Sequence, residues 1–343
     1  MKLSDLKTKI DVNRALWIVG GIAFLFIAYF LVWFNSRNIE ISNEPGRGPA
    51  SPLTGLACPG HERRPIAVML ASDPVARPLS GISQADMVVE MPVTPNGVTR
   101  LMALFQCETP TEIGSVRSAR AEFVPLAAGW NALYAHWGGE ANALAQLKTD
   151  VLDNIDALIY ENTAFFRKAN IRAPHNGFTT LDLLFATAKR LKYALESEVP
   201  IGYPHSTSGG SKNLSNLIQT IPIEYAPPYD VEWRYDAASQ TYRRFRNETP
   251  EIDKNTGDQV SAGVVIILAT TFTPLNKDYV SASLAGPGQA QIYQRGTVTT
   301  ATWHKDSQQL ASKLTFLDRS GKELGFQPGR IWIEIVDSAS VSP

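Results

Sequence analysis

The sequence predicts a membrane-anchored protein with two extracytoplasmic domains. The first is an α/β domain that combines a mixed sheet with helices, and the second is smaller and mainly antiparallel β. Three observations predict this architecture. A long uncharged apolar segment lies near the N-terminus, at residues 15–34. Short apolar runs alternate with helical patterns in residues 52–205, and strand patterns with Gly and Asp turns dominate residues 215–337.

The composition limits the possible functions. The 343 residues are 44% apolar and 19% charged, an ordinary mixture for a chain with a sizeable buried core. The formal net charge of -1 argues against nucleic acid as a partner, because nucleic-acid binders usually present a basic surface. The two cysteines exclude a disulfide-dense scaffold and a zinc site built only from cysteine. We expect no cofactor and no bound metal.

Ala15–Phe34 is the predicted transmembrane helix. It carries no charge, and at about 1.5 Å rise per residue it spans roughly 30 Å, the hydrocarbon core of a bilayer. Basic residues are concentrated before it: Lys2, Lys7, Lys9 and Arg14 precede it, and Arg37 follows closely. The positive-inside rule therefore predicts a single-pass protein of the cell membrane, with residues 1–14 in the cytoplasm and the chain after Arg37 outside.

A cleaved signal peptide is the alternative interpretation of this segment. The apolar run is too long for one, and no small-residue cleavage site follows it. Residues 35–51 are the predicted linker, because Asn38–Gly55 is polar and rich in Pro, Gly and Ser.

Residues 52–205 are predicted to form the α/β domain. Apolar runs bounded by turn residues predict strands at Ile66–Ala71, Met87–Val93, Leu101–Phe105 and Ala132–Ala135. Helical patterns lie at Ala121–Trp130, Ala141–Thr149 and Leu181–Leu195. The last pattern is the clearest, because its apolar residues follow the helical period and Thr179 or Thr180 can cap it.

Residues 215–337 are predicted to form the mainly β domain, after a flexible break at residues 206–211. Tyr229–Phe245 contains two strand patterns separated by a turn and predicts a hairpin. Further strands are predicted at Val264–Ala269, Ala290–Tyr293, Val298–Trp303, Lys313–Leu317 and Arg330–Val336.

The two cysteines are candidates for a disulfide. Cys58 lies just before the first predicted strand, and Cys107 lies just after the third. If those strands are antiparallel neighbours, the cysteines approach each other, and an extracytoplasmic location favours their oxidation. A disulfide between Cys58 and Cys107 is therefore a hypothesis, and it requires that the two strands pair as antiparallel neighbours.

The candidate site residues centre on Gly114–Gly139, which holds Arg117, Arg120 and His136. In α/β domains, ligands bind where the ends of strands meet loops. The candidate ligand-binding residues are Arg100, Arg117, Arg120, Arg172 and Asn176, and the candidate catalytic residues are His136, His175 and Glu90. We expect these side chains to converge.

The arginines have two interpretations. A guanidinium fork holds carboxylate or phosphate in two bonds, which predicts an anion site. Alternatively, the arginines form internal salt bridges with Glu90, Asp86 or Glu122. The histidines titrate near neutral pH and suit acid-base chemistry, but a histidine beside Gly or Pro is often only a hydrogen-bonded turn residue.

The sequence lacks the common catalytic and metal templates. His136, Glu140 and His175 could ligate a metal, but no HExxH-type spacing supports this. The HWGG motif lacks the GK[ST] signature of a phosphate loop, and Ser115 and Ser118 lack the GxSxG context of a nucleophile elbow. No motif in the sequence identifies a reaction.

Several motifs in fixed order resemble the YerB-like lipoproteins, a bacterial family of unknown function. The motifs are PLTGL (52–56), RRPIAVML (63–70), ARPLSGISQADMVVEMPV (76–93), VTRLMALF (98–105), IGSVRSAR (113–120), HWGG (136–139), RAPHNGF (172–178), VEWRYD (231–236), YRRF (242–245) and PGRIWIEIV (328–336). The resemblance covers residues 52–337 and implies a bacterial envelope protein with two domains and no established activity. The family is often lipid-anchored through a cysteine, but Cys58 lies far from the apolar run and lacks a lipobox. The transmembrane helix is therefore the expected anchor.

The site and the location together suggest a function. We expect an extracytoplasmic envelope protein whose arginine-rich pocket binds an anionic ligand, either a peptidoglycan fragment or a phosphate-bearing polymer. One alternative is a hydrolase or transferase that uses His136 or His175 with Glu90. Another is an assembly factor whose β domain binds a partner protein that the sequence does not identify.

Overall fold

The computed structural model describes residues 48–199, 201–206 and 217–340. The chain from Gly48 onward forms one compact unit. The predicted cytoplasmic segment (1–14), the predicted transmembrane helix (15–34) and most of the predicted linker (35–51) lie outside the described residues. Within the described part of the chain, no helix is long and apolar enough to cross a membrane.

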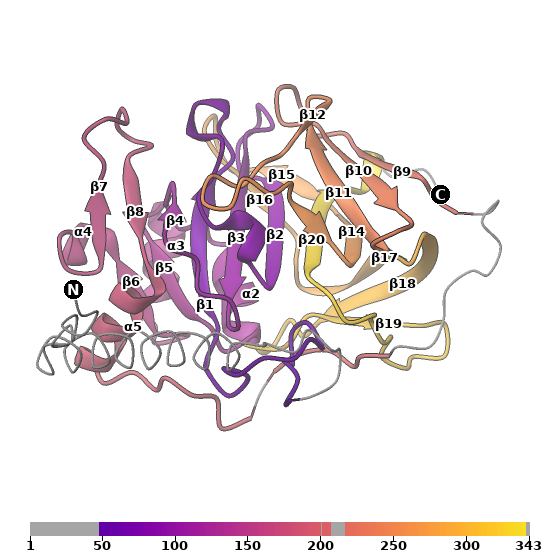
Figure 1. Ribbon diagram of the computed structural model, residues 1–343, viewed down its shortest axis with the longest axis horizontal. Helices are drawn as coiled ribbons and strands as arrows, with labels where there is room; N and C mark the ends of the chain where they lie inside the picture. Colours follow the sequence, from indigo (N-terminus) through magenta and orange to yellow (C-terminus); the bar gives the residue numbers. More distant parts are fainter. Residues whose placement is uncertain (1–47, 200, 207–216, 341–343) are drawn as a thin grey trace, which may run out of the picture. The chain divides into compact units, whose positions relative to one another are not determined.

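A ten-stranded mixed sheet forms the centre of this unit (Figure 1). Its order is β19-β18-β17-β14-β20-β2-β3-β1-β5-β6. The strands from the first half of the chain are β1 (Ile66–Ala71), β2 (Met87–Pro92), β3 (Thr99–Phe105), β5 (Leu133–His136) and β6 (Asn154–Asp156). Those from the second half are β14 (Val264–Thr270), β17 (Gly286–Gln294), β18 (Thr297–Lys305), β19 (Thr315–Leu317) and β20 (Ile331–Asp337). Most of the strands lie within a residue or two of the predicted apolar runs, and β17 and β18 extend beyond them.

The two halves of the chain join through parallel strands β2 and β20. Met87 pairs with Ile331, and Glu90 pairs with Glu334. On its other side β20 pairs with β14, also in parallel. The segments predicted as two domains therefore contribute to one continuous sheet.

The described residues also form three smaller sheets. The largest contains β9 (Thr220–Ile223), β10 (Val231–Asp236), β11 (Thr241–Arg246), β12 (Thr249–Pro250) and β13 (Ser261–Ala262). The antiparallel pairing of β10 with β11 confirms the predicted hairpin. The others are β15 (Phe272–Pro274) with β16 (Val280–Ala282), and β4 (Ile113–Gly114) with β8 (Gly177–Thr179) and β7 (Phe165–Arg167). The second half of the chain is thus rich in β structure.

The described helices are few and short: α2 (Phe123–Gly129), α3 (Ala141–Leu147), α4 (Ala157–Tyr160), α5 (Leu181–Arg190) and the 3-10 turns Pro74–Ala76, Ile82–Gln84 and Ser338–Ser340. Thr180 caps α5, because its Oγ1 accepts a hydrogen bond from the Leu183 amide at 3.2 Å. The helix ends before the predicted Leu195. Lys192 has a φ of 63°, in the left-handed region, so the helical conformation does not continue through it.

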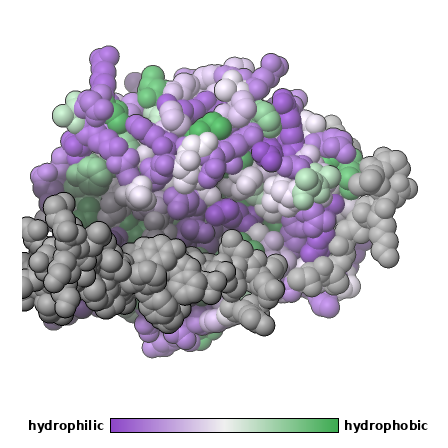
Figure 2. Space-filling view, in the orientation of Figure 1, coloured by the Kyte–Doolittle hydropathy of each residue, from purple (hydrophilic) through white to green (hydrophobic). Residues whose placement is uncertain are grey.

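Both faces of the central sheet are buried along β1, β2, β3, β14 and β20, which explains why these strands are nearly continuous apolar runs. Strands β17 and β18 are exposed along one face and alternate instead. On β1, Ala67 and Met69 belong to one hydrophobic cluster, and Val68 and Leu70 belong to the other. Helices α2 and α3 contribute to the first cluster, whereas α5 and the sheet containing β10 and β11 contribute to the second. On the face shown in Figure 2, hydrophilic residues predominate over hydrophobic ones.

The structure confirms the disulfide hypothesis. Cys58 and Cys107 are bonded, with their Cα atoms 5.3 Å apart. Strand β1 pairs antiparallel with β3, and Ile66 lies opposite Phe105. The chain before β1 therefore meets the chain after β3, as the hypothesis requires.

Candidate functional site

Several of the predicted site residues gather beside the ends of β1 and β3. We call the group Asp73, Arg100, Arg117, Arg120 and His175 the arginine site. Asp73 follows β1, Arg100 lies on β3, Arg117 and Arg120 lie between β4 and α2, and His175 precedes β8. Asp73 interacts electrostatically with Arg100, Arg117 and His175, and Arg100 interacts with Arg117 and Arg120. Strands and loops from different parts of the first half thus bring these charges together.

The Asp73 carboxylate lies beside Arg100 and Arg117. Arg100 Nη1 donates to Asp73 Oδ2 at 3.1 Å, and the Arg100 side chain is only 4% exposed. Burial alone would raise the pKa of Asp73, but Arg100 and Arg117 hold that pKa below its usual value. Burial and the neighbouring Arg117 lower the pKa of Arg100 to about 10, so Arg100 remains a cation at neutral pH. The site therefore holds buried positive charge close to solvent-accessible Arg117.

The arginine site contains polar atoms without partners. The Nε atoms of Arg100, Arg117 and Arg120, and Nδ1 of His175, are buried and make no hydrogen bond within the described part of the chain. Arg117 Nη1 donates to the Pro174 carbonyl at 3.3 Å, so Arg117 lies against the loop that carries His175. A buried donor without an acceptor costs about 1–3 kcal/mol. An anion that accepts from these guanidinium groups would remove part of that cost.

A hairpin from the second half of the chain covers Arg120. The Tyr279 ring, between β15 and β16, lies 5.2 Å from the Arg120 guanidinium carbon. Glu122 lies beside Arg120 and hydrogen-bonds Ser281 of the same hairpin, and burial raises the pKa of the Glu122 carboxyl. Glu140 accepts from the Ala121 amide at 2.8 Å. Arg120 is therefore the enclosed end of the arginine site, and Arg117 is the accessible end.

The two candidate histidines differ in whether their ring nitrogens are free to contact a ligand. Burial, with Arg117 and Arg100, lowers the pKa of His175, so its ring is neutral at neutral pH. His136 is fully buried. Its Nδ1 lies 2.8 Å from the Gly138 carbonyl and its Nε2 lies 3.3 Å from Asn154 Oδ1. His136 is therefore a satisfied buried residue and not part of the arginine site.

Arg172 and Asn176 flank the site without joining its polar contacts. Arg172 is exposed, and its carbonyl accepts from the His175 amide at 3.1 Å. Asn176 Oδ1 accepts from Arg167 Nη1 at 3.0 Å. The loop that carries them shapes the position of His175.

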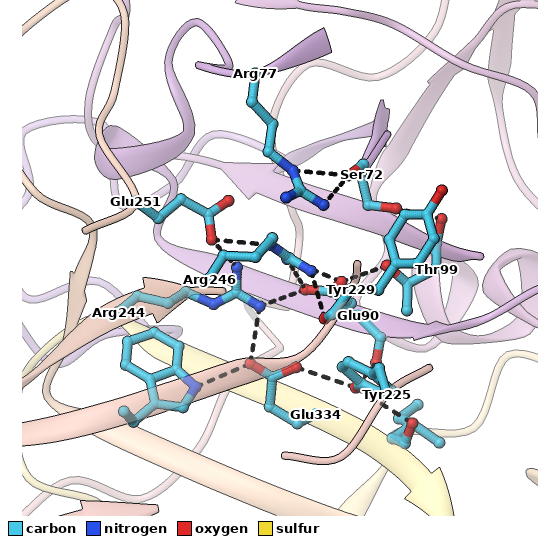
Figure 3. Close-up of polar contacts among 12 residues, drawn as sticks. Ser72, Arg77, Glu90, Thr99, Tyr225, Tyr229, Arg244, Arg246, Glu251 and Glu334 are labelled. Atoms are coloured by element: carbon cyan, nitrogen blue, oxygen red, sulfur yellow. Dashed lines mark hydrogen bonds and ion pairs between the residues drawn. The ribbon is translucent and has the colours of Figure 1, made fainter. Parts of the chain in front are cut away.

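Glu90 does not meet the histidines, because it belongs to a second cluster. We call Glu90, Arg244, Arg246, Glu251 and Glu334 the buried charge network (Figure 3). Glu90 Oε2 pairs with Arg244 and, at 2.7 Å, with Arg246. Arg244 also pairs with Glu251, and with Glu334 at 3.2 Å. The alternation of β11 points both arginines at the face of the central sheet where the two glutamates lie.

Further donors in this network hydrogen-bond the Glu334 carboxylate. Trp233 Nε1 donates to Glu334 at 2.9 Å, and the Tyr225 hydroxyl donates to it at 3.1 Å. Burial and the neighbouring Glu90 raise the pKa of Glu334. Burial alone would also raise the pKa of Glu90, but Arg246 and Arg244 lower it. These ion pairs and hydrogen bonds hold the sheet containing β11 against the paired strands β2 and β20.

The sequence reasoning missed Asp73, Tyr279 and most of the buried charge network. One signal was present: Glu90 and Glu334 each interrupt an otherwise apolar strand, in MVVEMP and IWIEIVD. A carboxylate in such a position is buried with the strand and requires charged partners.

The fold and these sites define a mixed α/β protein in which a large sheet with few helices carries a smaller β sheet over a buried network of charges. Two family models match the chain. The model described as "Protein of unknown function (DUF3048) N-terminal domain" matches residues 53–194, and the corresponding C-terminal domain model matches residues 221–333.

A curated relative and a solved structure match most of the chain. The "Putative lipoprotein YerB" of Bacillus subtilis (strain 168) is 30% identical over 339 residues, which cover 93% of this chain and 96% of that protein. The crystal structure of the YerB protein from Bacillus subtilis matches with a TM-score of 0.75 and 29% identity, over 84% of this chain and 96% of that one. This chain belongs to the YerB-like family, as its motifs predicted.

Proposed function

We propose that this chain is a membrane-anchored extracytoplasmic protein of the bacterial cell envelope, and that its arginine site binds an anionic group of an envelope polymer. The relative's description as a lipoprotein and the apolar segment at residues 15–34 both support membrane anchoring. Peptidoglycan stem carboxylates and phosphate-bearing polymers are the anions available in that location.

One observation carries the binding proposal. Arg100, Arg117 and Arg120 lie together, and the Nε atom of each is buried without a partner in the described residues. Arginines that serve as internal salt bridges pair with carboxylates through at least one nitrogen, as Arg244 and Arg246 do. Of the three arginines in the site, only Arg100 pairs with a carboxylate of the described residues, that of Asp73. Donors held in place without acceptors suit a ligand that supplies the acceptors.

The structure offers less support for the two alternatives. An enzyme using His136 or His175 with Glu90 would need them in contact, but Glu90 pairs with Arg244 and Arg246 instead. A partner-binding role would be favoured by a large apolar patch. The exposed large hydrophobic residues that the structure describes are scattered along the chain, and only Leu158 and Ile159 are adjacent in sequence: Leu56, Val75, Leu158, Ile159, Val199, Leu275, Val298 and Leu310.

Co-sedimentation with purified cell-wall sacculi tests the proposal. The full chain in mild detergent is mixed with sacculi that carry their phosphate polymers and with sacculi stripped of them, which separates the two anion sources. Arg117→Ala removes the accessible guanidinium. It should weaken retention about tenfold or more, because hydrogen bonds to charged groups contribute about 1.5–3 kcal/mol.

The matched control is Arg319→Ala, which removes an exposed arginine from a turn in the second half of the chain. It should leave retention unchanged. The melting temperature of the Arg117→Ala protein should stay close to that of the parent chain, because Arg117 is only partly buried. Equal retention of both variants would contradict the anion-binding proposal.

A further inference from the structure

A cavity of about 440 Å³, lined by no residue of the arginine site, lies between the loop before β2 and the segment after β11. Its apolar wall contains Pro78, Leu79, Pro250 and Ile252, and two charged residues, Arg77 and Glu251, also line it. This volume falls within the range of small-molecule sites in proteins. The cavity borders the buried charge network, because Glu251 belongs to both.

Both charged residues are fixed in place and retain a free polar atom. Arg77 Nε donates to the Ser72 carbonyl at 2.9 Å, and Nη2 donates to the same oxygen. Glu251 Oε2 pairs with Arg244 and Arg246. Among the residues that the structure describes, Arg77 Nη1 and Glu251 Oε1 have no hydrogen-bond partner. Figure 3 shows Arg77 and Glu251 on the same side of Arg246.

Arg77 and Glu251 are neighbours that do not touch. Each acts electrostatically on the other. No Arg77–Glu251 ion pair within 4.0 Å occurs in the described structure, although Arg246 lies within reach of Glu251. Both residues line the cavity, so a ligand in it can lie between the opposite charges. A ligand that carries both a cation and an anion can contact both residues without leaving an uncompensated charge.

We propose that this cavity binds a small zwitterion with an apolar body, namely an amino acid or a short peptide with free ends. Its carboxylate contacts Arg77, its ammonium contacts Glu251, and its side chain packs on Leu79, Pro250 and Ile252. Arg246 lines the cavity too, but its donors are occupied by Glu90, Glu251 and the Tyr229 carbonyl, so it contributes charge and not a free hydrogen bond.

Hydrogen bonds connect the two segments that line the cavity, so the site is preorganised. Beyond Ile252, the Asp253 carboxylate accepts from the Ser83 amide at 2.8 Å and from the Gly81 amide at 3.3 Å. The Lys254 amide donates to the Leu79 carbonyl at 2.8 Å. A cavity held open before binding costs less ordering entropy when the ligand enters.

Isothermal titration of the full chain in mild detergent tests the proposal with four probes: leucine, alanyl-leucine, N-acetyl-alanyl-leucine and alanyl-leucine amide. We expect binding by leucine, alanyl-leucine or both. Each blocked dipeptide should bind at least about tenfold more weakly than alanyl-leucine, because each block removes one charge-assisted contact. No binding by either free-ended probe, or equal binding by all three dipeptides, would overturn the proposal.

Thr249→Trp tests the location. Thr249 is an exposed strand residue that lines the cavity, so a tryptophan there fills the cavity without disturbing the core. The control is Thr300→Trp, on an exposed position of β18. Loss of binding only in Thr249→Trp supports the site, whereas unchanged binding in that variant refutes it. The blocked dipeptides keep the proposal falsifiable even if Thr249→Trp does not fold.

Discussion

Replacing Arg244 by Met should destabilise the protein strongly. Arg244 is fully buried, pairs with Glu90, Glu251 and Glu334, and its guanidinium carbon lies 4.1 Å from the centre of the Trp332 ring. Met fills a similar volume but donates no hydrogen bond, so it leaves buried carboxylates short of a cation. Breaking a buried ion pair in this way costs about 3–5 kcal/mol. For a unit of this size, that loss lowers the melting temperature by roughly 5–8 °C.

The adjacent arginine on the same strand provides the control. Arg243 points to the opposite side of β11, where it is exposed and pairs with Asp236 at 2.6 Å. Arg243→Met removes the same charge and should cost less than about 1 kcal/mol, as surface ion pairs do. Urea and thermal unfolding of the full chain measure both variants. Losses of equal size for Arg243→Met and Arg244→Met would refute the role assigned to the buried charge network.

Two further predictions concern the disulfide and acid. Replacing Cys58 and Cys107 together by Ser should lower the free energy of unfolding by about 2–4 kcal/mol, because the bond closes a loop over a sequence separation of 49; urea unfolding measures this, and an unchanged midpoint would contradict it. Burial alone would raise the pKa of Glu251, but Arg244 and Arg246 lower it to about 2. The ordinary pKa of a glutamate is about 4.5, so ionised Glu251 contributes its full stability at pH values above 4.5. This stability is lost as the pH falls from 4.5 toward 2. The raised pKa of Glu334 has the opposite effect, since that contribution is present below 4.5 and is lost as the pH rises. Urea midpoints between pH 5 and pH 2.5 should fall for the parent chain and fall less for Arg244→Met, because Arg244 lowers the pKa values of both Glu251 and Glu90; parallel curves would argue against these two carboxylates as the responsible groups.

Much of the secondary structure could be predicted, because local patterns determine it. The runs IAVMLA and VVIILAT are buried on both sides of the sheet, and their uninterrupted apolar character predicts strands. Thr180 marked the start of α5 through its side-chain oxygen. The end of that helix depends on the left-handed Lys192, for which the sequence offers no comparable signal.

The sites were only partly predictable, because their contacts are distant in sequence. Arg117, Arg120 and His175 were found since each lies near the end of an element. Glu90 was grouped with the histidines for the same reason, yet its partners Arg244 and Arg246 lie 154 and 156 residues away. Their meeting depends on the pairing of β2 with β20 and on the packing of β11 over that junction, neither of which a local pattern specifies.

The position of β20 also affects the order in which the chain folds. The ribosome makes β20 after every other described strand, but β20 lies in the interior of the sheet, between β14 and β2. Until it arrives, β2 and β14 present unpaired backbone edges, which are templates for aggregation. Completion of the sheet thus waits for Ile331–Asp337, and a nascent chain stalled before this segment would depend on chaperones to shield both edges.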